Sequence, residues 1–222
     1  MTRLSEPEVY QGQFGEFTIT PQDRQGVIIY RSALGVAAIC FALGTVAILW
    51  QGNDPLVLNM LSVLFLIFSL AMGVALVTIH IYMAWLHRLL QIFWGIGSIA
   101  ALWFEFQDPQ PLALTIYNQP LALFGIGFTF AALTGIFFKE SFCFNRFETK
   151  FLTFLVPVLM LGHLFGLMPV LWEQVLLGIW AVLFLVFGFR KAIQAIPPDI
   201  GDKSVFTYLK NKQKDSATLI NS

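Results

Sequence analysis

The chain has 222 residues, of which 57% are hydrophobic and 12% charged, against roughly 45–50% and 25% in ordinary soluble domains. Thirteen Lys and Arg balance thirteen Asp and Glu, and this zero net charge argues against a nucleic-acid partner. The two Cys residues, Cys40 in an apolar run and Cys143 in a polar segment, argue against a disulfide framework.

Long uncharged runs recur along the whole chain. About 20 apolar residues in a helix cross the hydrocarbon core of a bilayer, and each of these runs is long enough. We therefore predict an all-α fold, a polytopic membrane helix bundle with six transmembrane helices. The expected organisation is an N-terminal cytoplasmic segment over residues 1–20, the transmembrane domain over residues 21–195, and a flexible cytoplasmic tail over residues 196–222.

The chain opens with a weakly alternating stretch, residues 9–20, that favours a short strand or hairpin. The sequence TPQD follows, with Thr20 as the N-cap and Pro21 at the first helical position, which is typical of a helix start. This first helix is expected to end near Trp50. The other spans are expected at residues 56–82, 90–104, 120–138, 151–168 and 171–189.

Three short segments mark boundaries of these spans. HRLL (residues 87–90) marks the connection between the second and third spans, and the pattern fits either a true turn or a kinked continuous helix. FFKESFCFNRFETKF (residues 137–151) is expected to be a charged, aromatic loop between the fourth and fifth spans. IPPD (residues 196–199) ends the sixth span, because Pro cannot continue a helix.

The distribution of basic residues predicts the orientation. An even number of spans places both ends on one side, and all thirteen Lys and Arg fall on that side. The opposite connections carry Asp54, Glu105, Asp108 and Glu173 but no basic residue. Excess Lys and Arg mark the cytoplasmic side of a membrane protein, so both termini are predicted to be cytoplasmic.

The three His residues are the candidate ligand-binding residues. His80 and His87 would lie about 10 Å apart on a continuous helix, too far for one metal ion, and they suit an interfacial belt. His163 lies inside the fifth span, where an ionisable residue suggests function. Gly162 and Gly166 surround it with a GxxxG pattern, so a packing role and a single axial ligand to chlorophyll or haem both stay open. No metal site is predicted.

No motif indicates catalysis. The sequence lacks a phosphate loop, GxSxG, HExxH and CxxC, so no catalytic residue is predicted. Glu173, at the start of the sixth span, is interpreted as a partner of the helix dipole. Gly97 with Ala101, and Gly127 with Ala131 and Gly135, are interpreted as close-packing faces.

The loop between the fourth and fifth spans carries the candidate docking residues. Large aromatic side chains dominate the energetics of interfaces. The residues expected to contact a partner are Phe142, Cys143, Phe144, Arg146 and Phe147.

Three segments carry a resemblance to a known family: VYQGQFGEFTITPQDRQGVIIYRSALG (9–35), IHIYMAWLHRLLQ (79–91) and KESFCFNRFETKFLTFLVPVLMLGHLFGL (139–167). They resemble an integral membrane family of cyanobacteria and plastids that has no assigned function. The similarity covers about residues 9–195. It implies a plasma or thylakoid membrane, and it brings neither a reaction nor a ligand set.

Three functions compete at this point. The leading hypothesis is an accessory or assembly protein that sits in the lipid bilayer and docks through its cytoplasmic segments onto a larger, photosynthetic membrane complex. The alternatives are a small oligomeric transporter or channel, and a membrane protein that binds a tetrapyrrole, a quinone or a lipid. The absence of charge near the middle of any span counts against an ion-coupled transporter.

Overall fold

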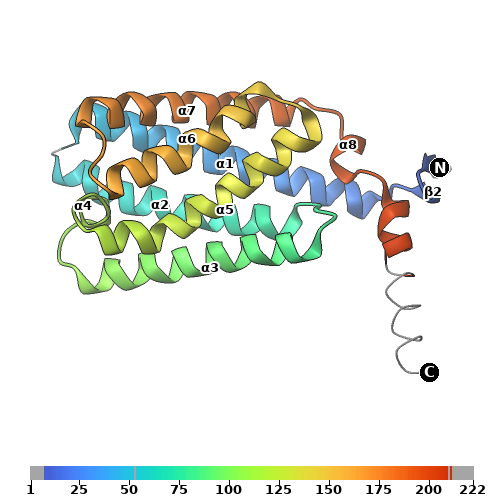
Figure 1. Cartoon of the computed structure of the whole chain (residues 1–222), viewed down its shortest axis with the longest axis horizontal. Helices are drawn as coiled ribbons and strands as arrows, with labels where there is room; N and C mark the ends of the chain where they lie inside the picture. The colour runs from blue at the N-terminus through green and yellow to red at the C-terminus, as the bar shows by residue number, and fades with distance from the viewer. Residues whose placement is uncertain (1–7, 53, 210, 212–222) are drawn as a thin grey trace, which may run out of the picture.

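The computed structural model describes residues 8–52, 54–209 and 211, and these fold into a bundle of long helices (Figure 1). Six of the helices in the described part are long and apolar enough to cross a membrane, which confirms the predicted fold class. They are α1 (Pro21–Gln51), α2 (Pro55–Thr78), α3 (Ala84–Gln107), α5 (Pro120–Phe144), α6 (Phe147–Leu164) and α7 (Val170–Ala192).

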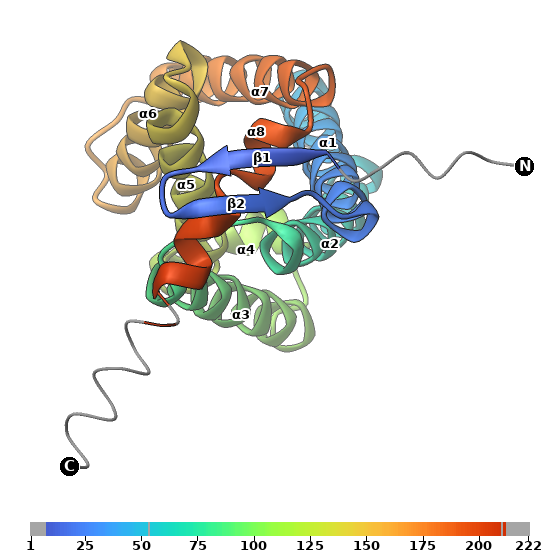
Figure 2. The same cartoon turned by 90° about the vertical axis from the view of Figure 1, so that its right-hand side faces the viewer.

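The smaller elements lie at the two ends of the bundle. Strands β1 (Val9–Gly12) and β2 (Gly15–Thr18) and helix α8 (Pro197–Ile200) lie together at one end, which we call the hairpin end (Figure 2). The short helix α4 (Leu112–Asn118) lies at the opposite end, which we call the cavity end (Figure 1).

The six long helices form a closed ring of neighbours. Successive contacts join α1 to α2, α2 to α3, α3 to α5, α5 to α6, α6 to α7, and α7 back to α1. Aromatic and aliphatic side chains fill the interior, with Phe137, Phe184 and Phe187 fully buried. Because each helix has two helical neighbours, each exposes the rest of its apolar surface outward, as a lipid-facing bundle does.

The start of the chain folds as its sequence predicts. Val9 pairs with Thr18 and Gly12 with Gly15 in an antiparallel hairpin. Thr20 caps α1: its hydroxyl accepts from the Asp23 backbone N–H at 3.2 Å, and Asp23 Oδ2 accepts from the Thr20 backbone N–H at 2.8 Å. This reciprocal pair satisfies two backbone donors that an uncapped helix start would leave free.

The boundary between the second and third spans lies earlier than predicted. Helix α2 ends at Thr78 and α3 begins at Ala84, so a true turn separates them and HRLL belongs to α3. A side chain explains the early break. His87 Nε2 lies 2.5 Å from the Leu76 carbonyl oxygen, one of the acceptors that the end of α2 leaves without an intrahelical donor.

The predicted loop over residues 137–151 is almost entirely helical. Helix α5 runs to Phe144 and α6 starts at Phe147, so Asn145 and Arg146 alone connect them. Asn145 adopts a left-handed conformation with φ of 51°, which Asn tolerates better than most residues. The sequence suggested a loop because the segment is charged, but its two Glu residues, Glu140 and Glu148, are buried and pair with Lys191 and Arg190 of α7.

The fifth span also ends earlier than predicted, at Leu164. Gly166 has a φ of 62°, and the Leu167 backbone N–H donates to the Gly162 carbonyl at 2.8 Å, which turns the chain toward α7. Gly162 faces the Met168 side chain of this turn. The GxxxG pattern therefore builds a helix end here and not a contact between two helices.

Residues 197–209, expected to belong to a flexible tail, pack against the hairpin. Asp202 Oδ2 accepts from the Gln13 backbone N–H at 2.6 Å, and Ser204 Oγ accepts from that of Phe14 at 3.0 Å. The rings of Phe14 and Tyr208 stack with centroids 4.0 Å apart. The segment covers the hairpin end, while the rest of the predicted tail, residues 210 and 212–222, lies outside the described residues.

A cluster of buried charges joins four elements at the hairpin end. Lys191 of α7, with 0% of its side chain exposed, donates to Glu140 of α5 at 2.5 Å and also to Asp199 of α8. Arg31 of α1 contacts Asp199 at 2.6 Å, and the Tyr30 hydroxyl donates to Glu140 at 3.0 Å. We call these five residues the charge cluster; Lys139 adds a third cation beside it, with its Nζ 3.0 Å from Glu140 Oε1.

The charge cluster also completes the end of α7. Arg31 donates to the backbone carbonyls of Gln194 and Ala195 at 2.5 and 2.8 Å. These carbonyls follow the last turn of α7, where a cation matches both the free acceptors and the negative end of the helix dipole. The cluster thus fixes the last turns of α5 and α7, and α8, against the N-terminal third of α1.

Replacing Gly97 by Ala should destabilise the bundle. A Cβ at Gly97 would overlap the backbone and hydroxyl of Thr129 on α5, whereas Gly95, on the same helix, has open space. We expect Gly97→Ala to cost about 1–3 kcal/mol, as overpacking does, and Gly95→Ala to be neutral or slightly stabilising. Thermal unfolding in detergent measures the difference, and equal melting temperatures would contradict the close α3–α5 approach.

Replacing Lys191 by Met should be more damaging. It leaves Glu140 and Asp199 buried with fewer partners, and breaking a buried ion pair on one side costs about 3–5 kcal/mol. The matched control is Arg88→Met, which removes an exposed cation at the same end and should change stability by less than about 0.5 kcal/mol. Equal unfolding temperatures for the two variants would show that the cluster does not stabilise the fold.

Candidate functional site

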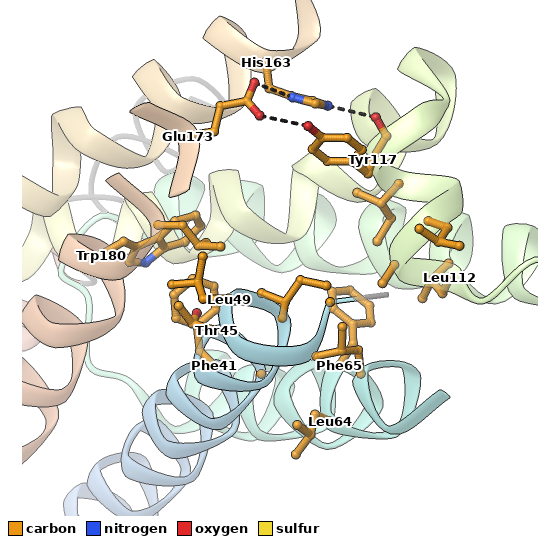
Figure 3. Close-up of a pocket in the computed structure, with 18 of the residues that line it drawn as sticks. Phe41, Thr45, Leu49, Leu64, Phe65, Leu112, Tyr117, His163, Glu173 and Trp180 are labelled. Atoms are coloured by element: carbon orange, nitrogen blue, oxygen red, sulfur yellow. Dashed lines mark hydrogen bonds and ion pairs between the residues drawn. The ribbon is translucent and has the colours of Figure 1, made fainter. Parts of the chain in front are cut away.

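An apolar cavity of about 500 Å³ lies at the cavity end of the bundle. Six helices contribute to its wall: α1, α2, α4, α5, α6 and α7. Most of the lining is apolar, and Figure 3 labels Phe41, Leu49, Leu64, Phe65, Leu112 and Trp180 among the residues that form it. This volume falls within the range of about 300–1,000 Å³ that small-molecule sites occupy.

Packed aromatic rings support the inner part of this wall. The Trp180 ring lies against Phe41 with centroids 4.4 Å apart, and it meets Phe130 edge-on at 5.3 Å. Trp180 and Phe68, on α7 and α2, are almost fully buried. Rings from four helices hold one another in place here, so the hollow has rigid walls on this side.

Three polar side chains from three different helices meet at one edge of the cavity (Figure 3). His163 Nδ1 lies 2.7 Å from Glu173 Oε1, and His163 Nε2 lies 2.9 Å from the backbone carbonyl oxygen of Tyr117. The Tyr117 hydroxyl donates to Glu173 Oε2 at 3.3 Å. We call Tyr117, His163 and Glu173 the outer triad.

Helix ends bring the outer triad together. His163 lies in the last turn of α6, Glu173 in the first turn of α7, and Tyr117 in the last turn of α4. The tight turn at Gly166 folds α7 back beside α6, which places Glu173 next to His163. His163 is therefore at a helix end, because α6 stops at Leu164, four residues before the predicted end of the fifth span.

The hydrogen bonds define the protons that the outer triad holds. A backbone carbonyl only accepts, so His163 Nε2 must donate to Tyr117. The other ring nitrogen faces a carboxylate at 2.7 Å, and that contact requires one proton between Nδ1 and Oε1. The pair is an imidazolium with a carboxylate, or a neutral imidazole with a carboxylic acid. Its net charge is zero in both arrangements.

Tyr117 adds a phenol that stays protonated. Burial, and then the neighbouring Glu173 carboxylate, raise the pKa of Tyr117 above its ordinary value. The phenol is therefore a hydrogen-bond donor over the whole physiological pH range. Its ring also lies against the His163 ring, with centroids 4.5 Å apart.

The triad leaves no free histidine nitrogen for a metal. Both ring nitrogens of His163 are occupied, so axial ligation of haem or chlorophyll would require a different arrangement of this residue. Across residues 8–52, 54–209 and 211, no group of three His, Cys, Asp or Glu side chains is arranged to hold a metal ion. The site is suited to hydrogen bonding.

His80 and His87 lie at the other end of the molecule. His87 belongs to α3 and bonds to the end of α2, with Gln91 Nε2 at 3.2 Å from its Nε2. His80 is half-buried in the turn between α2 and α3, and burial lowers its pKa. Neither residue lines the cavity, so the structure separates the three histidines that the sequence grouped as candidates.

The predicted docking residues divide into two sets. Phe142 and Phe147 are 83% and 74% exposed, and Cys143 is exposed as well. Phe144 instead packs under Lys191, whose Nζ lies 4.1 Å from the ring centroid, and Arg146 donates to Gln194 Oε1 at 2.5 Å. The structure therefore leaves three of the five available at the surface.

Sequence reasoning missed Tyr117, the role of Glu173, and the charge cluster. One signal was present: Tyr117, His163 and Glu173 all lie near connections on the side opposite the termini. Nothing in the sequence showed that α4 would fold over the bundle end and bring Tyr117 to His163. Lys191 and Glu140 appeared to be ordinary basic-side charges of the membrane boundary.

Comparison with known proteins gives a family and nothing further. No curated protein and no solved structure shows significant similarity to the chain. A family profile matches residues 74–208, which include His163, Glu173, Tyr117 and all of the charge cluster except Tyr30 and Arg31. The match covers more than half of the 222 residues, and the chain belongs to the family described as uncharacterized integral membrane protein (DUF2301).

Proposed function

We propose that this integral membrane protein binds an apolar small molecule in the cavity, with a polar group of the ligand at the outer triad. The cavity itself carries the proposal. It combines a mostly apolar lining with one cluster of convergent polar side chains, the usual composition of a small-molecule site. Of the functions that the sequence left open, this composition of the lining supports the binding of a lipid or quinone.

The distribution of basic residues indicates on which side of the membrane the cavity lies. The cavity end lies opposite the hairpin end, where the described Lys and Arg residues gather. If the basic end is cytoplasmic, as the positive-inside rule predicts, the cavity belongs to the outer half of the bilayer. We propose this orientation, with both termini in the cytoplasm.

A second candidate function is supported by the exposed aromatics at the α5–α6 turn. Phe142 and Phe147 project from the hairpin end, and large exposed aromatics often anchor a partner. We propose that this turn docks onto a larger membrane complex, in which the chain acts as an accessory or assembly protein. The resemblance to cyanobacterial and plastid proteins supports a photosynthetic complex in a plasma or thylakoid membrane.

Filling the cavity should abolish ligand binding. Leu49 of α1 lines the cavity, while Val46, one turn earlier, is 58% exposed on the outer surface and does not. We expect Leu49→Trp to reduce at least tenfold the amount of co-purifying apolar molecule, and Val46→Trp to leave it unchanged. Mass spectrometry of extracts from protein purified in mild detergent measures this. An unchanged content in Leu49→Trp would contradict the cavity proposal.

Cys143 provides a test of orientation and docking. It is exposed at the hairpin end, whereas Cys40 is buried in α1. A membrane-impermeant maleimide should label Cys143 in inside-out vesicles and not in intact cells, and Cys143→Ser should abolish the labelling. Labelling in intact cells would reverse the proposed orientation.

A bifunctional crosslinker at Cys143 should capture a defined membrane protein, and specific capture should disappear in Phe142→Ala.

A further inference from the structure

We propose that the molecule bound in the cavity is a neutral lipid alcohol whose hydroxyl group donates a hydrogen bond to the outer triad. This inference rests on the proposed binding function and specifies its ligand. It follows from two properties of Tyr117, His163 and Glu173: which hydrogen-bonding groups they have already used, and the net charge that they carry.

The donors of the outer triad are all engaged within it. His163 Nε2–H donates to the Tyr117 carbonyl, one proton lies between His163 Nδ1 and Glu173 Oε1, and the Tyr117 hydroxyl donates to Glu173 Oε2. What remains is acceptor capacity. An ionised carboxylate has about four lone-pair sites, of which these contacts use two, and the Tyr117 oxygen has lone pairs as well. The triad can therefore accept a hydrogen bond but has none to give.

The net charge of the triad excludes charged ligands. His163 and Glu173 together carry no net charge, so an anionic headgroup would meet the carboxylate without an uncompensated cation to offset it. An ammonium group would bring a second positive charge to the Glu173 carboxylate, whose negative charge the His163 imidazolium already balances. The side chains of His163 and Glu173 are 22% and 13% exposed, so water solvates an uncompensated charge beside them poorly, and both arrangements cost free energy. A neutral polar group is the one that fits.

Among neutral groups, the triad selects a hydrogen-bond donor. An ether or ketone oxygen brings only an acceptor, and would lie unsatisfied against other acceptors. A hydroxyl supplies the missing donor. Among the other polar residues of the lining, Gln174 and Thr45 can each donate or accept, and Ser62 donates to Glu105 at 3.2 Å. The buried Trp180 Nε1–H has no partner among the described residues and calls for an acceptor, which a hydroxyl oxygen can also provide.

The size of the cavity suggests the length of the ligand. If each non-hydrogen atom takes roughly the 30 Å³ that a water molecule occupies in the liquid, 500 Å³ holds 500/30, or about 17 such atoms. A saturated alcohol such as 1-tetradecanol comes close to this size. It can place its chain among the aromatic rings while its hydroxyl reaches Glu173.

The test uses the full chain in lipid nanodiscs and a photoreactive diazirine derivative of 1-tetradecanol. After irradiation, mass spectrometry locates the labelled peptides. Unlabelled 1-tetradecanol, its methyl ether and tetradecanoic acid are compared as competitors. We expect labelling of cavity-lining peptides of α1 and α7, and competition by the alcohol at about tenfold lower concentration than by the ether or the acid. Empty nanodiscs correct for partition into lipid.

A Glu173→Gln variant tests the role of the triad. Its amide can donate to His163 Nδ1, so the contact between α6 and α7 is kept, while the acceptor left for the ligand is a single neutral amide oxygen, weaker than the carboxylate. We expect the preference for the alcohol over the ether to fall from about tenfold to less than threefold. Glu173→Asp, which keeps a carboxylate, should retain more of the preference than Gln does.

The outcomes separate the two proposals. Labelling of the cavity with equal competition by alcohol, ether and acid would overturn the alcohol inference and leave the cavity as a binding site. The same is true if Glu173→Gln keeps the full preference. Absence of labelling in the cavity lining with the wild-type chain would overturn the binding function, and the alcohol inference with it.

Discussion

The contact of Lys191 with the carboxylates of Glu140 and Asp199 is the constraint on which the arrangement of the bundle depends. A fully buried ammonium group is tolerable only if its counterions converge on it, so α5, α7 and α8 must end at one place. Arg31 extends the same requirement to α1 and uses the carbonyls that follow α7. Six apolar helices could pack against each other in several registers. The pairing of buried charges is possible in far fewer of these registers, because each ion must meet a partner at the same depth.

The two ends of the molecule differ in how they are held together. At the hairpin end, buried charges, the β-hairpin and residues 197–209 are joined by hydrogen bonds and ion pairs. At the cavity end the helices enclose a hollow, and the outer triad is the polar contact that joins α4, α6 and α7 there. A cavity lacks the packing contacts that a filled core would have, so its helices must be stabilised elsewhere. The tightly paired hairpin end supplies that stability, and the cavity end can therefore enclose a hollow.

Binding in the cavity and docking at the α5–α6 turn are compatible, because they use opposite ends of the bundle. The turn with Phe142 and Phe147 lies at the hairpin end, while the cavity belongs to the other half. Helices α5, α6 and α7 reach both regions. The part of the chain that matches the family profile, residues 74–208, contains the whole outer triad and most of the charge cluster.

The sequence by itself determined the all-α membrane fold and its six spans, because long apolar runs are a local pattern. The capped start of α1 and the hairpin before it were also predicted locally, from Thr20 with Pro21 and Asp23 and from the alternation over residues 9–20. It also predicted the close-packing role of Gly97. It misplaced the ends of α2, α5 and α6, because a side chain from another element decides the α2 boundary and the charges near Asn145 are neutralised by distant partners. Only the tertiary structure brought Tyr117, His163 and Glu173 together and showed Lys191 to be buried. Those contacts join residues 8 to 56 positions apart, and a single sequence carries no record of which of these residues meet.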